Sequence, residues 1–267
     1  MAAYLLRDPK GSGECGAAIN RFLDELLCPV NPYISQFTRP VRTLSDGIYR
    51  QEQELSAMVA ALAKFYRIDF PSNLLDGLTD QLEIRPEGAK GCLVVASYHE
   101  LGRHFGVADV YGDGMPMLVA RTAELLAKRI TFGNYLTLKS GTIQTNPDVR
   151  PILEREDGKG RLNAYWLPDL TQWGGRSPLN SRWECLQAGQ LAMPTLYGLQ
   201  GVVQMPQWIT GEQMRPDLIG DDYWYGGAWS HCPGLGRGGD EGGLGAGWRG
   251  GPGGGAGGAS LLPRSAA

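Results

Sequence analysis

"GCLVVASYHELGRHFGVADVYGDGMP", residues 91–116, is the stretch around which the rest of the chain can be placed. Its first six residues form a continuous, partly β-branched apolar run, which predicts a buried strand. From Gly112 onward the sequence predicts a helix, because Pro116 suits a first helical turn and Asp113 can cap it. Residues 98–114 are therefore expected to form a long polar loop from strand to helix.

The segments on either side of this stretch differ in their periodicity. Apolar residues at helical spacing predict helices at 13–29, 45–68 and 72–82. Later segments predict strands at 134–143, 161–167 and 195–205 and short helices at 148–156 and 181–192. This order predicts an α+β or α/β fold, with a helical N-terminal layer, residues 1–88, packed on a small mixed sheet within residues 89–232. Residues 1–232 are expected to form a single globular domain.

Residues 233–267 have an unusual composition. Fifteen of these thirty-five residues are glycine, so ordering them costs backbone entropy and buries few side chains. The segment is therefore predicted to be a disordered tail, whose deletion would leave the thermal midpoint nearly unchanged. A GC-rich gene translated in the wrong frame gives a similar composition, so a tail that is not in its native frame is the second interpretation.

The overall composition argues against several classes of protein. The 267 residues are 42% hydrophobic, enough for a buried core, and the formal net charge of -3 gives no basic surface for nucleic acid. Five separated cysteines without a CxxC pair argue against a disulfide framework. No apolar run approaches the roughly 18 residues of a membrane helix. A soluble, cytoplasmic protein without membrane insertion is expected.

Two of the three histidines lie in the predicted loop, together with acidic side chains. His99 and His104 can act as metal ligands or as bases, and Glu100 and Asp109 provide carboxylates, so metal-assisted or acid–base chemistry is expected there. On a helix, the five-residue spacing of the histidines would turn their rings about 140 degrees apart. Both can therefore bind one metal only if the segment is a loop. The alternative is an ordinary turn whose imidazoles bond to backbone carbonyls.

Three further features extend this candidate site. His231 can complete a site for a divalent metal with the two loop histidines, if its segment folds back over the loop. Asp113 is a candidate for binding a ligand at the start of the following helix. The adjacent Asp221 and Asp222 can bind a hard cation, although two carboxylates beside glycine predict a solvated turn more readily.

All seven tryptophans follow residue 165, and most of them lie in segments that also contain glycine or proline, such as "QMPQWITG" and "GDDYWYGGAWSHCP". Tryptophan in such a position is often partly exposed, because its indole N–H needs a polar partner. We expect Trp208 and Trp224 to be exposed and to bind a planar ligand or a partner protein. The alternative is that the tryptophans form the core of a region with little regular structure.

The sequence thus supports two functions from different classes. The first is a soluble intracellular enzyme that hydrolyses a small polar substrate with His99, Glu100, His104 and Asp109. The second is a non-enzymatic interaction or assembly protein of a bacterial complex or mobile element, with residues 166–229 as its contact surface. Imidazole and carboxylate groups that converge in one pocket would favour the enzyme.

Overall fold

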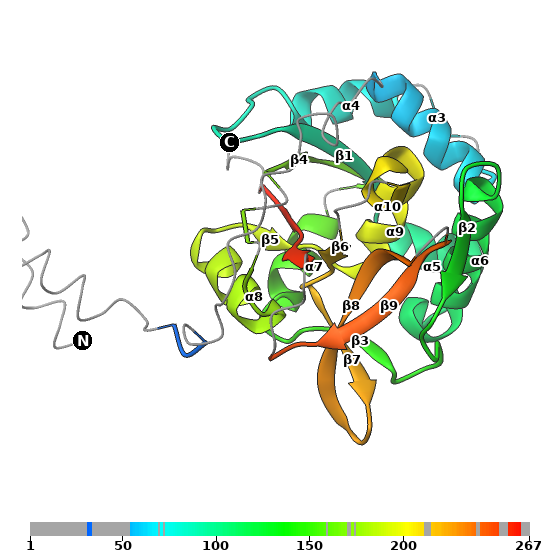
Figure 1. Cartoon of the computed structure of the whole chain (residues 1–267). Coiled ribbons are helices and arrows are strands. Elements are labelled where there is room, and N and C mark those ends of the chain that lie inside the picture. The colour runs from blue at the N-terminus through cyan, green and yellow to red at the C-terminus, as the bar shows by residue number, and fades with distance from the viewer. Residues whose placement is uncertain are drawn as a thin grey trace, which may run out of the picture. The chain divides into compact units, whose positions relative to one another are not determined.

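The computed structural model describes residues 31–33, 54–68, 70–71, 73–158, 160–169, 172–173, 175–210, 215–238, 241–250 and 256–262 (Figure 1). The chain divides into two compact units, residues 1–32 and 33–267. Only Asn31 and Pro32 of the first unit are described, so the helix predicted at 13–29 lies outside the described residues. The helices and strands given below belong to the second unit.

Helices and strands both contribute to this unit. The helices are α3 (Leu55–Tyr66), α4 (Leu74–Gln81), α5 (Tyr98–Phe105), the π-helix η3 (Val110–Gly114), α6 (Met115–Leu126), α7 (Arg150–Asp157), α8 (Pro178–Gln187), α9 (Thr195–Gln204) and α10 (Gln207–Thr210). The strands are β1 (Gly91–Ala96), β2 (Thr131–Asn134), β3 (Ile143–Thr145), β4 (Leu162–Leu167), β5 (Leu191–Ala192), β6 (Arg215–Asp217), β7 (Asp221–Tyr225), β8 (Ala228–Gly238), β9 (Glu241–Trp248), β10 (Ala256–Gly258) and β11 (Ser260–Leu261). This mixture confirms the predicted α+β class. Among the described helices, none combines the length and apolarity needed to cross a lipid bilayer.

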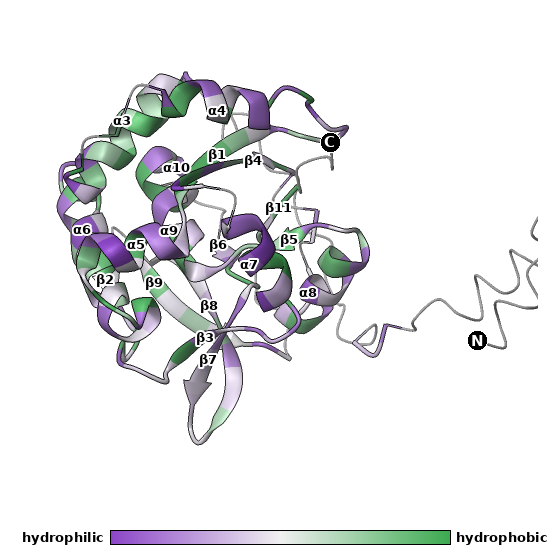
Figure 2. Ribbon diagram, turned by 180° about the vertical axis from the view of Figure 1, so that it is seen from behind, coloured by the Kyte–Doolittle hydropathy of each residue, from purple (hydrophilic) through white to green (hydrophobic). Residues whose placement is uncertain are grey.

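β1 is the buried strand that the apolar run predicted. Leu93, Val94 and Val95 are fully buried, and β1 pairs antiparallel with β4 in a two-stranded sheet. Helix α3 packs on β1 and α4 packs on β4 (Figure 1). β1 is mostly hydrophobic, whereas hydrophilic residues dominate α7 (Figure 2). The predicted packing of N-terminal helices on a small sheet is therefore seen in α3 and α4.

Residues 195–205 were predicted to form a strand, and this prediction is wrong, because they form α9. Two amide side chains one helical turn apart connect α9 to the main chain of β1. Gln200 accepts from the Ala96 N–H at 2.6 Å and donates to the Ala96 carbonyl at 3.2 Å. Gln204 likewise accepts from the Val94 N–H at 3.2 Å and donates to its carbonyl at 2.6 Å. Helical geometry brings both amides to the same side of α9, which the apolar pattern alone did not reveal.

The glycine-rich segment forms part of a seven-stranded sheet. The strand order is β10-β6-β8-β7-β3, and β9 pairs with both β8 and β2. The second half of β8 and the whole of β9, β10 and β11 come from residues that the composition assigned to a disordered tail. That prediction is wrong for the described residues 233–238, 241–250 and 256–262. Residues 263–267 lie outside the described part of the chain.

Close packing explains why glycine occurs in these strands. A Cβ atom at Gly243 would lie 2.7 Å from the carbonyl oxygen of Gly133 on β2 and 2.7 Å from the ring of Tyr135. Leu235 and Leu244 face each other across β8 and β9 and are 1% and 0% exposed. Pairing of strands on both sides and burial of the leucines thus offset the entropy cost of ordering glycine.

Gly201 on α9 provides a test of this packing. A Cβ atom there would overlap the indole ring of the fully buried Trp208. Gly201→Ala is therefore expected to lower the free energy of unfolding by about 1–3 kcal/mol, the usual cost of overpacking a core. Gly77→Ala on α4 is the matched control, since a Cβ there meets nothing within 4 Å. The control should gain up to about 1 kcal/mol from better helix propensity. Urea unfolding of both variants measures the difference, and equal shifts would contradict the packing.

Candidate functional site

Residues 98–114 do not form the predicted loop. Ser97 caps α5 by accepting from the Glu100 N–H at 3.1 Å, and Gly106, with φ 67, ends that helix in the left-handed region. The π-helix η3 follows and runs directly into α6. Its cap is Asp109, which accepts from the Gly112 N–H at 2.8 Å. Asp113 is exposed and does not cap α6, so that part of the prediction is wrong, because the π-turn moves the start of the helix upstream.

A cleft of about 550 Å³ opens beside α5 and η3. Four segments contribute to its walls, and two of them, β3 and α7, follow the predicted loop by about thirty residues or more. The lining residues are Tyr98, His99, Asp109, Tyr111, Ile143, Gln144, Thr145, Arg150, Leu153, Glu154 and Asp157. Imidazole, carboxylate, guanidinium, hydroxyl and amide groups therefore line one cavity.

Of the four residues proposed for catalysis, the structure brings two to this cleft. His99 is exposed and lines it from α5, and Asp109 lines it from the start of η3. The Asp109 carboxylate is held in place, because its second oxygen accepts from the Ser140 hydroxyl at 2.8 Å. These two side chains are the part of the predicted constellation that converges.

Glu100 has a different environment, buried between two arginines. Its carboxylate accepts from Arg103 at 2.6 and 2.7 Å and from Arg161 at 2.6 and 3.0 Å. Burial opposes ionisation of Glu100, but the hydrogen bonds from Arg161 and Arg103 outweigh it and lower its pKa. The side chain thus joins α5 to the start of β4, and it is not among the residues that line the cleft.

The three histidines proposed as metal ligands occupy three separate environments. His104 is exposed on α5 beside the rings of Tyr66 and Phe105, away from the cleft residues. His231 lies on β8, where its ring centroid is 4.7 Å from that of Tyr225. Within the described ranges, no group of three or more His, Cys, Asp or Glu side chains is arranged to hold a metal ion. Because residues 98–105 are helical, the five-residue spacing separates His99 from His104 as the helical geometry requires.

Sequence reasoning missed the cleft residues of α7 and β3. Arg150, Glu154 and Asp157 lie at positions i, i+4 and i+7 of α7, so they share one face of the helix. The i, i+4, i+7 spacing was visible in a segment already predicted to be helical, but only the fold shows that this face of α7 meets α5.

Asp157 is buried, and its carboxylate accepts from the Tyr98 N–H at 2.5 Å and from the Tyr197 hydroxyl.

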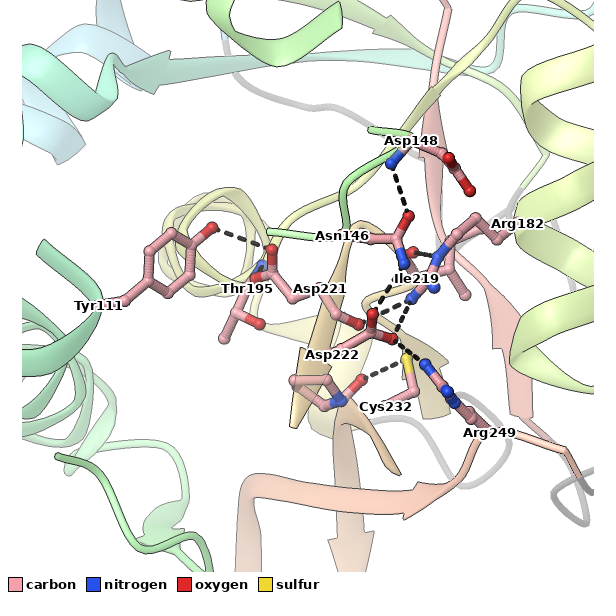
Figure 3. Close-up of polar contacts among 11 residues, drawn as sticks. Tyr111, Asn146, Asp148, Arg182, Thr195, Ile219, Asp221, Asp222, Cys232 and Arg249 are labelled. Carbon is pink, nitrogen blue, oxygen red and sulfur yellow. Dashed lines mark hydrogen bonds and ion pairs between the residues drawn. The ribbon is translucent and has the colours of Figure 1, made fainter. Parts of the chain in front are cut away.

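A chain of hydroxyl groups leads from the cleft to the buried Asp221, and Figure 3 shows its last step, from Tyr111 to Asp221. Thr145 donates to the Tyr111 hydroxyl at 3.0 Å, and Tyr111 donates to one oxygen of Asp221 at 3.0 Å. The other oxygen accepts from the Thr195 N–H at 2.6 Å. Burial raises the pKa of Asp221 to about 7, although the hydrogen bonds from Thr195 and Tyr111 and the nearby Arg182 act in the opposite direction. Burial likewise raises the pKa of Tyr111, which keeps its phenol neutral.

Asp222, the next residue on β7, is neutralised by cations. Arg182 and Arg249 donate to one of its oxygens at 3.0 and 3.2 Å, and Asn146 donates to the other at 2.7 Å (Figure 3). Asp221 and Asp222 are 0% and 2% exposed, so the predicted solvated turn is wrong. Their burial follows from the central position of β7, between β8 and β3.

The two tryptophans predicted to be exposed differ. Trp208 is fully buried against α9, so its predicted exposure is wrong, whereas Trp224 is 40% exposed, as predicted. Trp224 lies on the hairpin of β7 and β8, which projects from the rest of the sheet (Figure 1). Trp229 packs edge-on against it, with ring centroids 5.3 Å apart.

Comparison of the chain with known protein families, with curated proteins and with solved structures finds no match.

Proposed function

We propose that the protein is an enzyme that uses acid–base chemistry to hydrolyse a small polar substrate bound in the cleft between α5, η3, β3 and α7. The observation that carries this proposal is the convergence of an imidazole with charged groups of both signs in one cavity of about 550 Å³. A cavity of this size suits a small molecule, and a few polar groups in it suffice to orient the substrate.

The cleft residues divide into distinct roles. His99 exchanges protons with the substrate, because an imidazole can both donate and accept a proton and this one lines the cleft. Arg150 binds an anionic or carbonyl group of the substrate, and no ion pair within the described residues engages its guanidinium. Asp109 and Asp157, each fixed by two hydrogen bonds, accept hydrogen bonds from the substrate.

Two histidine variants on the same helix test the proposal. Hydrolysis of p-nitrophenyl acetate by purified protein is the assay, and a panel of p-nitrophenyl phosphate and glycosides extends it to other bonds. His99→Ala is expected to lower the rate about 100-fold, the lower end of what general acid–base groups contribute. His104→Ala should leave the rate unchanged, since His104 lies on the same helix but outside the cleft lining. Equal rates in both variants on every compound would contradict the proposal.

The exposed aromatic hairpin favours a second candidate, a protein that binds a partner through residues 223–231. This segment holds no Lys, Arg, Asp or Glu, and Trp224 and Tyr225 are 40% and 61% exposed. Aromatic side chains with few charges are typical of the centre of protein interfaces. A photo-crosslinking amino acid in place of Tyr225 should capture a discrete partner in cells, whereas one in place of Tyr135, which is 66% exposed, should not.

A further inference from the structure

Two adjacent aspartates on β7 are buried in very different electrostatic surroundings. Asp222 is paired with two arginines, whereas the carboxyl of Asp221 meets only neutral donors, the Tyr111 hydroxyl and the Thr195 N–H. Among the described residues, none forms an ion pair with Asp221. A buried carboxylate without a counter-ion is costly, and taking up a proton removes that cost.

The hydroxyl groups beside Asp221 lead toward the cleft. Tyr111 and Thr145 both line the cavity, and each heavy-atom distance along the chain from Thr145 through Tyr111 to Asp221 is 3.0 Å. We infer that Asp221 is a proton reservoir for the cleft, connected to it by the hydroxyl groups of Tyr111 and Thr145. The inference deepens the proposed function and rests on it for the use of the proton. Asp221 acts through these two residues and does not touch the substrate.

Each transfer along this chain conserves the number of protons. In the loaded state Asp221 donates to the Tyr111 oxygen, Tyr111 donates to the Thr145 oxygen, and Thr145 donates to a basic atom in the cleft. When that atom takes the Thr145 proton, Thr145 takes the proton of Tyr111, and Tyr111 takes the proton of Asp221. Asp221 is left as a carboxylate that accepts from Tyr111 and from the Thr195 N–H. The reverse sequence reloads it, because hydroxyl groups both donate and accept.

The remaining groups around Asp221 do not replace this route. Arg182 from α8 donates to the main-chain oxygen of Asp221 at 2.9 Å and neutralises the carboxylate of Asp222. Cys232 from β8 is fully buried, and burial raises the pKa of its thiol, so it stays protonated. Burial also raises the pKa of Asp217 to about 7, but Asp217 lies on β6 and is neither among the residues that line the cleft nor part of this hydroxyl chain.

Titration of Asp221 also predicts how stability depends on pH. The folded-state pKa of about 7 lies above the ordinary value of 3.8, so the folded state binds more protons than the unfolded state between these values. Stability therefore falls as the pH rises through this range and levels off above it. The free energy of unfolding of wild type minus that of Asp221→Asn should accordingly decrease from about pH 4 to about pH 7, since asparagine does not titrate.

Infrared spectroscopy of the protein without any substrate tests the reservoir directly. Wild type at pH 6 should show carbonyl absorption from buried protonated carboxyls, and the band that is lost in Asp221→Asn, while that of Asp217 remains, should decline in wild type as the pH rises through about 7. On transfer to D2O the band should shift quickly, because the chain opens to the cleft. Thr145→Val and Tyr111→Phe should slow that shift roughly tenfold or more, since exchange must then wait for local opening.

Tyr223→Phe is the matched control. It removes another buried phenol hydroxyl, which accepts from the Thr137 N–H at 3.0 Å, but leaves the chain intact, so it should exchange like wild type. Absence of a protonated-carboxyl band that depends on Asp221 would overturn the reservoir. An exchange rate unchanged in Thr145→Val and Tyr111→Phe would overturn its connection to the cleft. Neither infrared result depends on catalysis. A failure of the reservoir is therefore distinguishable from a failure of the proposed hydrolytic function, which the rates of His99→Ala and His104→Ala test.

Discussion

A chain that ends at Cys232 is expected to show no cooperative unfolding transition. The truncation removes the second half of β8 and the whole of β9, β10 and β11, and with them the pairing partners of β2, β5 and β6. Leu235, Leu244 and Leu261 are at most 1% exposed, and burial of each contributes about 1.5–3 kcal/mol. Their combined loss approaches the whole stability of a typical domain, about 5–15 kcal/mol. This outcome is the opposite of what the glycine content alone predicts.

Thermal unfolding followed by circular dichroism measures this effect. A chain that ends at Leu262 is the matched control, because it keeps every described strand and should unfold near the wild-type midpoint. An unchanged midpoint for the chain that ends at Cys232 would show that β9 to β11 do not stabilise the fold. It would also support the interpretation that the segment is not in its native frame.

Arg182→Ala should lower the free energy of unfolding by about 3–5 kcal/mol, the usual cost of removing one partner of a buried ion pair. Arg182 is 4% exposed and donates to three acceptors: the carboxylate of Asp222 and the main-chain oxygens of Ile219 and Asp221. The substitution leaves two carbonyls without this donor and leaves Asp222 with Arg249 alone. It also opens a cavity between α8 and β7.

The matched control is Arg67→Ala, which removes an arginine from an exposed ion pair. The side chains of Arg67 and Glu124 are 69% and 56% exposed, so this pair should contribute no more than about 1 kcal/mol. Chemical denaturation of the two variants under identical salt conditions separates the two effects. A loss in Arg182→Ala no larger than in the control would contradict the role of this arginine in the core.

Local periodicity was sufficient for the elements whose own residues carry the pattern. The apolar run of β1, the helical stripes of α3 and α4, and the segments of α7 and β4 formed as predicted. The helix predicted at 181–192 forms only as far as Gln187, and residues 135–142 of the strand predicted at 134–143 are not in a strand. Two further errors fall where distant residues decide the outcome. α9 is a helix, and its side chains are hydrogen-bonded to β1. The glycine-rich strand β9 pairs with β2, which lies more than a hundred residues earlier in the chain.

The candidate site was predictable to a similar extent. Residue type and position after β1 led to His99 and Asp109, which do line the cleft. Glu100 and His104 share the same segment but point elsewhere, because the segment is helical and distributes its side chains around an axis. The contribution of Arg150, Glu154 and Thr145 depends on where α7 and β3 pack. No local pattern contains that information.

The two glutamines of α9 also protect the chain against association with itself. In a two-stranded sheet, β1 would otherwise present free N–H and carbonyl groups along its outer side, a template on which a strand of another molecule can add. Gln200 and Gln204 occupy those groups at Ala96 and Val94, so an apolar strand that could nucleate aggregation is closed by side chains of its own chain.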